Sequence, residues 1–158
     1  MPLRDATLVN ASVHETATFA DAVAVLFAAR VPALAVLDDA GRVVGIFSEG
    51  DLLRAVFPGY LAEVRHTAFL PDDAPTLDAL ARRVRDQPVG DFARRTELLG
   101  ADDSQIHAAE RFMHTGEDAL PVVEEGRFVG MLSIAALCQG RLDRVEEAAE
   151  PGAGGAQS

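Results

Sequence analysis

The chain contains an internal duplication, and this limits its fold more than any other feature. Gly41–Ser48 recurs 85 residues later as Gly126–Ser133, with eight consecutive positions that agree in character. Just upstream, Ala33–Asp39 recurs as Ala119–Glu125. A unit of about 60 residues is marginally stable alone, so we expect two units to bury their sheets against each other. This predicts one α/β module with pseudo-twofold symmetry and two related clefts between the sheets.

Each copy shows the same order of local signals. An amphipathic helix is predicted to begin after Thr18 in one copy and after Ser104 in the other, because both residues are good N-caps. These helices should end near Arg30 and Gly116. A strand, an acidic turn, a second strand and a second helix beginning at a serine follow in each copy. The residues expected on the buried helix faces are Leu26, Phe27, Phe112 and Met113.

Composition changes divide the chain into four parts. We place the first repeat at residues 3–58, a helical connector at 59–88 and the second repeat at 89–145. Within the connector, the spacing predicts short helices over 60–69 and 76–86. The remaining residues, 146–158, combine glutamates with Pro and Gly and contain little apolar surface, so we expect a disordered tail.

Charge and residue usage exclude several functions. The 14 basic residues are all arginine and face 25 acidic ones, for a net charge of −11, which disfavours nucleic acid and anionic membranes. Without lysine there is no Walker A lysine and no Schiff base. The single cysteine forms no internal disulfide, and the first residues lack a secretion signal, so we expect a cytoplasmic protein that does not enter membranes.

Gly45–Leu53 fits the pattern G-x-x-S/T-x-x-D-L, and Ala119–Val123 contains L-P-V-V. These two segments resemble the signature of paired CBS domains, the family named after cystathionine beta-synthase. The resemblance implies two β-α-β-β-α repeats packed with pseudo-twofold symmetry into one module, and association into homodimers. It also implies regulatory binding of an adenosine-containing ligand such as AMP, ADP, ATP or S-adenosylmethionine, with no other cofactor.

Asp51 is the residue on which a ligand site most depends. A carboxylate can accept hydrogen bonds from both vicinal hydroxyls of a ribose, and Ser48 places a hydroxyl and a helix N-terminus nearby. The alternative is a capping box, in which the same two residues only stabilise the helix start. The second copy keeps the serine as Ser133 but has Ala136 in place of the aspartate. We therefore expect the second pocket, assigned to Val31, Ala33 and Ser133, to bind adenosine weakly or not at all.

The family resemblance adds residues from the second repeat to the Asp51 site. The residues at the L-P-V-V strand of the second repeat are Glu117, Asp118, Ala119 and Leu120. The segment 89–92, including Phe92, would contact the base. For the apolar residues Ala119, Leu120 and Phe92, the alternative is core packing. Basic residues that often precede this strand in phosphate-binding members are absent, which favours few phosphates or the cationic S-adenosylmethionine. Positive charge could still come from Arg30, Arg94, Arg95 or from Arg65 with His66.

No catalytic constellation emerges. Gly45–Gly50 lacks the glycine that a nucleophile elbow requires two residues before its serine. His107 and His114 lie seven residues apart, but no further ligands complete a metal set. Two hypotheses remain: a non-enzymatic regulatory module that senses an adenosine-type metabolite, and a ligand-free dimerisation scaffold that engages an unknown protein partner.

Overall fold

The computed structural model describes residues 1–63 and 74–155, and these form two β-α-β-β-α repeats as expected. Each repeat contains a three-stranded sheet, ordered β1-β2-β3 in the first and β4-β5-β6 in the second. In both sheets the first strand runs parallel to the second, and the second and third form an antiparallel hairpin. The strands are β1 (Ser12–His14), β2 (Ala33–Leu37), β3 (Val43–Ser48), β4 (Leu99–Gly100), β5 (Ala119–Glu124) and β6 (Arg127–Ser133). The helices are α1 (Phe19–Ala29), α2 (Glu49–Val56), α3 (Ala74–Arg85), α4 (Gln105–Thr115) and α5 (Ile134–Gly155).

The predicted helix boundaries of α1 and α4 are confirmed by their caps. The Thr18 hydroxyl accepts a hydrogen bond from a first-turn amide of α1, and the Ser104 hydroxyl does the same in α4, each at 3.1 Å. Both helices end on a left-handed residue, Arg30 at φ 55° and Gly116 at φ 71°. Glycine adopts this conformation without the Cβ penalty that Arg30 incurs.

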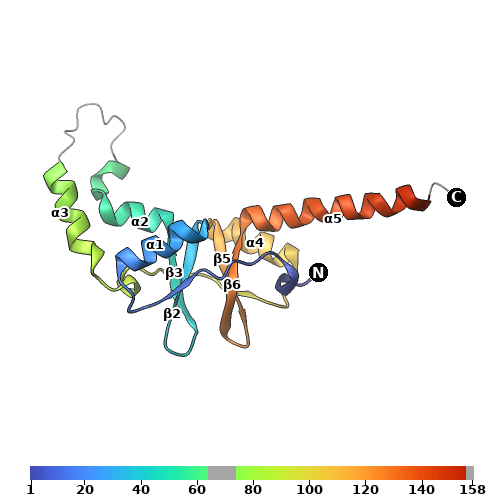
Figure 1. Ribbon diagram of the computed structural model, residues 1–158, viewed down its shortest axis with the longest axis horizontal. Coiled ribbons are helices and arrows are strands. Elements are labelled where there is room, and N and C mark those ends of the chain that lie inside the picture. The colour runs from blue at the N-terminus through green and yellow to red at the C-terminus, as the bar shows by residue number, and fades with distance from the viewer. Residues whose placement is uncertain (64–73, 156–158) are drawn as a thin grey trace.

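Each repeat also lends a short lead-in segment to the sheet edge of the other. The backbones of Arg94 and Ile46 exchange two hydrogen bonds, at 2.8 and 2.9 Å. Val9 and Met131 exchange two more, at 2.8 and 3.0 Å. The four residues obey the 85-residue offset of the duplication, so the exchange follows the pseudo-twofold symmetry. The two hairpins therefore lie side by side, with their turns at one end and the α1, α2, α4 and α5 helices at the other (Figure 1).

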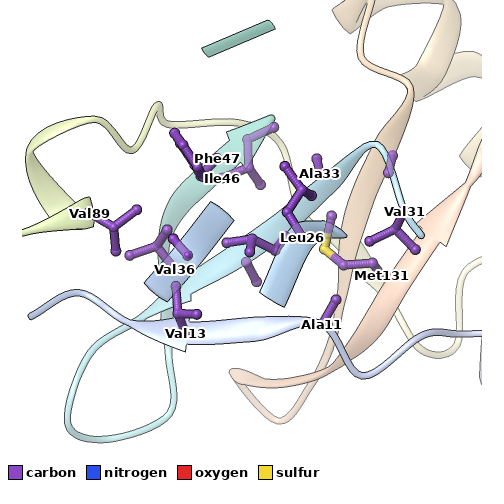
Figure 2. Packing of buried hydrophobic residues seen from close by; sticks show 14 of the residues in the cluster. Ala11, Val13, Leu26, Val31, Ala33, Val36, Ile46, Phe47, Val89 and Met131 are labelled. Carbon is purple, nitrogen blue, oxygen red and sulfur yellow. The ribbon is translucent and has the colours of Figure 1, made fainter. Parts of the chain in front are cut away.

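The two hydrophobic cores meet at the symmetry axis. The first core is built from β1, β2, β3 and α1, but it also contains Ala119 of β5 and Met131 of β6. Figure 2 shows Met131 among the side chains of the first repeat, with Leu26 and Val31 close to it. Leu120 and Leu132 belong to the second core instead. Alternate residues of β5 and β6 thus serve different cores, because successive strand residues point to opposite faces.

The expected burial of the paired helix residues is half right. Leu26 and Phe112 are buried, but Phe27 and Met113 are 86% and 82% exposed. Consecutive residues on a helix point about 100° apart, so only one of each pair can face the sheet. Sequence reasoning placed both on the core side because both are large and apolar.

The connector and the tail complete the chain. The second predicted connector helix is confirmed as α3, whose Val84 is buried in the first core and which contacts α1 and α2. Most of the first predicted connector helix falls outside the described residues, and Gly59–Ala62 forms a 3-10 turn. The tail differs from the expected disorder, since α5 continues to Gly155. The glutamates and alanines of 146–150 are strong helix formers, which accounts for α5 continuing to that point. Pro151 and the glycines after it are poor helix formers, so propensity does not explain the last turn.

Candidate functional site

The candidate site begins where β3 ends and α2 starts. Ser48 is the last residue of β3 and caps α2, and its hydroxyl accepts a hydrogen bond from the Asp51 amide at 3.2 Å. In return, Asp51 Oδ2 accepts from the Ser48 amide and from the Ser48 hydroxyl, both at 2.9 Å. This is the capping box predicted as the alternative reading of these residues. The box uses only one of the two carboxylate oxygens.

The second carboxylate oxygen is held by two arginines. Asp51 Oδ1 accepts from Arg94 Nε at 2.6 Å and from Arg54 Nη2 at 2.7 Å. The Arg94 guanidinium also makes two bonds to Glu117, Nη1 to Oε1 at 2.7 Å and Nη2 to Oε2 at 3.2 Å. Arg94 thus bridges a carboxylate of the first repeat and a carboxylate of the second, and its charge is shared between two acids.

These contacts control the protonation of the site. Asp51 is only 7% exposed, and burial by itself raises the pKa of a carboxyl group. Hydrogen bonds from Arg94, from Ser48 and from Arg54 outweigh burial and hold the pKa of Asp51 below its ordinary value. The bonds to Glu117 and Asp51 raise the pKa of Arg94. At neutral pH both groups are therefore charged.

A cavity of about 340 Å³ opens beside this network, and both repeats line it. Its charged residues are Glu49, Arg54, Arg94, Glu117 and Asp118. Pro32, Ala33 and Ser48 complete much of the remaining wall, with two glycines, Gly50 and Gly116. Acidic groups outnumber basic ones in this wall.

The structure brings together some of the residues expected at the Asp51 site. Ser48 and Asp118 line the cavity, as does Glu117, and Asp51 is bonded to three residues of the wall. Ala119 and Leu120 are completely buried in the two cores. Val89 is also completely buried, and the Phe92 ring packs edge-on against Phe19 with centroids 5.0 Å apart.

The residues assigned to the second pocket lie in different surroundings. Val31 is buried in the first core, and Ala33 lines the Asp51 cavity. Ser133 caps α5 by accepting a hydrogen bond from the Ala136 amide at 3.0 Å. No carboxylate follows Ser133 in the first turn of α5, so this cap is not reinforced as the cap at Ser48 is.

Two features of the site escaped the sequence analysis. Arg54 was not considered, although its place one turn after Asp51 on a predicted helix signals a contact. Arg94 was considered only as a source of positive charge, and its partners lie 43 and 23 residues away in the sequence. Arg95, its neighbour, lines a separate cavity with Val43–Gly45. Arg65 and His66 lie outside the described residues.

The described part of the chain offers neither a metal-binding cluster nor a membrane-spanning helix. Over residues 1–63 and 74–155, no three His, Cys, Asp or Glu side chains are grouped so that they could hold a metal ion. Within the same residues, no helix combines the length and the apolar character needed to cross a membrane. Cys138 is a free, exposed thiol on α5.

Comparisons with known proteins assign both repeats to one family. The family model of the CBS domain matches residues 7–58 and again residues 89–141. CBS-domain pairs are generally regulatory modules, and no catalytic family is indicated. A search among curated proteins gives no match.

Solved structures share the fold. The CBS domain of a CBS domain-containing membrane protein from Sphaerobacter thermophilus is 26% identical, with a TM-score of 0.66 over 88% of this chain and 86% of that one. A CBS domain-containing protein of unknown function from Kribbella flavida is 18% identical, with a TM-score of 0.70 over 90% and 99% of the two chains. CBSX2, solved in complex with AMP, is 22% identical, with a TM-score of 0.65 over 90% and 96%.

Proposed function

Because the chain belongs to the CBS-domain family and carries the domain twice, we propose that it is a regulatory module that binds an adenosine-containing ligand in the cavity beside Asp51. The observation that carries this proposal is a buried carboxylate at the start of α2, beside a cavity that both repeats line. That AMP occupies one similar structure, CBSX2, supports the same ligand class.

The chemistry of the site suits a ribose. The Asp51 carboxylate has the acceptor capacity for both donors of a vicinal diol, and the Ser48 hydroxyl lies beside it. The cavity volume of about 340 Å³ lies at the small end of ligand pockets, which fits a compact ligand. Since both repeats line the cavity, occupancy can favour one arrangement of the repeats over another, to the extent that the ligand binds the two with different affinity.

The charge of the cavity wall favours ligands with few phosphates. Glu49, Glu117 and Asp118 face Arg54 and Arg94, and both arginines already bond to acids. A triphosphate would therefore meet net negative charge. AMP, adenosine and the cationic S-adenosylmethionine remain the better candidates.

The test is thermal unfolding with AMP, ADP, ATP, S-adenosylmethionine and NAD, each added to the parent chain and to Asp51→Ala. A ligand present at 100 times its dissociation constant stabilises the parent by about 2.7 kcal/mol. We expect this gain with AMP or S-adenosylmethionine, and we expect Asp51→Ala to lose it when each protein is compared with its own unliganded midpoint. Asp21→Ala is the matched control, because Asp21 occupies the same helix position in α1 but lies outside the cavity. An equal response from parent and Asp51→Ala would refute the proposal.

A second candidate is a ligand-free dimerisation scaffold for a protein partner. It is favoured by the internal bonds that already occupy both oxygens of Asp51. It is also favoured by exposed apolar side chains at equivalent positions of the two repeats, Phe27 with Met113 and Phe57 with Leu142. We propose homodimer formation through these helices under either function. A chain that dimerises but gains no stability from any compound in the panel would support the scaffold.

A further inference from the structure

Every acceptor position of Asp51 is already in use. A carboxylate offers about four lone-pair positions. In this structure four donors reach it, namely the Ser48 amide, the Ser48 hydroxyl, Arg54 Nη2 and Arg94 Nε. A ribose diol can therefore bind Asp51 only by displacing two of these donors.

The geometry indicates which donors leave. The Ser48 amide belongs to the capping box, and the Ser48 hydroxyl is itself held by the Asp51 amide, so both Ser48 donors stay with the start of α2. The two arginines share Oδ1, and their side chains are partly exposed, 39% for Arg94 and 67% for Arg54. Arg94 has a second anchor, because its two bonds to Glu117 remain when its bond to Asp51 breaks. The more exposed Arg54 can turn into solvent.

Building on the proposed function, we propose that Arg94 occupies the sugar-binding position of Asp51 in the unliganded protein and acts as its built-in competitor. The two ligand hydroxyls replace Arg94 Nε and Arg54 Nη2 on Oδ1, and Glu117 retains the Arg94 guanidinium. Arg94 and Glu117 belong to the second repeat, whereas Asp51 belongs to the first. Ligand binding therefore breaks an ion pair that joins the two repeats.

The internal duplication supports a joint role for Arg94 and Asp51. The position equivalent to Arg94 is Val9, since both make the same backbone exchange, with Ile46 and Met131 respectively. The position equivalent to Asp51 is Ala136. The arginine and the aspartate thus occur together at one of the two symmetry-related sites and are both missing from the other. Valine is accommodated in this backbone pairing, so Arg94→Val is a conservative way to remove the guanidinium.

The test measures adenosine binding by isothermal titration calorimetry for the parent, Arg94→Val, Arg95→Val and Asp51→Ala. Adenosine is neutral, so removing an arginine does not simply remove a phosphate contact. Arg94→Val removes the charge-assisted bond that competes with the ligand for Asp51 Oδ1, so adenosine should bind this variant about tenfold more tightly. Arg95→Val removes the same charge one residue away and should bind like the parent. Asp51→Ala should lose binding.

The outcomes separate the two proposals. Equal or weaker adenosine binding by Arg94→Val overturns the competitor role, while loss of binding in Asp51→Ala still upholds the ligand site. No binding by either the parent or Arg94→Val overturns both proposals, because the freed carboxylate would then fail to hold a ribose. If Arg94→Val does not fold, Arg94→Gln, which keeps most of the side-chain volume, takes its place with the same expected direction.

Discussion

At the scale of single residues, Asp51 shows how a charged side chain can be buried. Transferring a carboxylate from water is costly unless partners replace its hydration. Ser48 provides two neutral donors from the same helix start, and Arg94 and Arg54 provide two charged ones. The capping box and the proposed sugar site therefore draw on the same carboxylate. Capping explains the Oδ2 contacts and leaves the Oδ1 contacts to the arginines.

The lowered pKa of Asp51 predicts a pH-dependent contribution to stability. Since the folded pKa lies below the ordinary 3.8, this contribution is present above that value and is lost as the pH falls through the folded pKa. We expect Asp51→Asn to be less stable than the parent by about 1–3 kcal/mol near neutral pH. The difference should shrink when urea unfolding is repeated near pH 3.

Asp21→Asn is the control for this titration, because it changes a first-turn aspartate that bonds to no arginine among the described contacts. Its difference from the parent should be small at both pH values. A stability gap for Asp51→Asn that stays constant across the titration would contradict the assigned role of the carboxylate charge.

At the scale of elements, the glycine of the signature permits the exchange of lead-in segments. A Cβ at Gly45 would lie 2.7 Å from the carbonyl oxygen of Arg94. Its counterpart Gly130 faces Leu8, whose Cβ would be 2.6 Å away. Both distances are too short for any side chain, so the lead-in segment of the other repeat can pair with β3 or β6 only over glycine. The same contact places Arg94 next to Asp51.

Gly45→Ala should therefore loosen this pairing. The backbone of Arg94 must move away from β3, and we expect a loss of about 1–3 kcal/mol in the free energy of unfolding. Gly140→Ala is the contrasting variant, because it lies in α5 with no atom near the added Cβ and should be neutral or stabilising by up to about 1 kcal/mol. Chemical unfolding of both variants measures the difference, and equal stabilities would contradict the tight approach at Gly45.

At the scale of the whole molecule, the pseudo-twofold symmetry extends to the surface. Phe27 and Met113 occupy equivalent positions on α1 and α4 and are almost fully exposed. Phe57 directly follows α2, and Leu142 lies within α5, again at equivalent positions. Large apolar side chains that are repeatedly exposed on the helices indicate an interface rather than chance. A second copy of the chain, which carries the same pattern, is the partner that we propose.

Light scattering coupled to gel filtration tests this interface. We expect the parent to be a dimer and the double variant Phe27→Asp, Met113→Asp to be a monomer with unchanged circular dichroism. Dimerisation of the double variant would bury two unpaired carboxylates per protomer in an apolar interface, which is strongly unfavourable. Val129→Asp, at an exposed position of β6 and not on these helices, should remain dimeric. A monomeric parent, or a double variant of dimer mass, would contradict the proposed surface.

The sequence by itself determined the repeat, the hairpins, the caps at Thr18, Ser48 and Ser104, and the family of the fold. These features depend on local patterns, because caps, turns and strand periods act over a few residues and the duplication repeats them. It also located Asp51 and Ser48 as the centre of the candidate site. Only the tertiary structure decided which large side chains of α1 and α4 face the core, and how far α5 extends. Only the tertiary structure brought Arg94 between Asp51 and Glu117, because that contact depends on how one repeat packs on the other, and no local pattern records such packing.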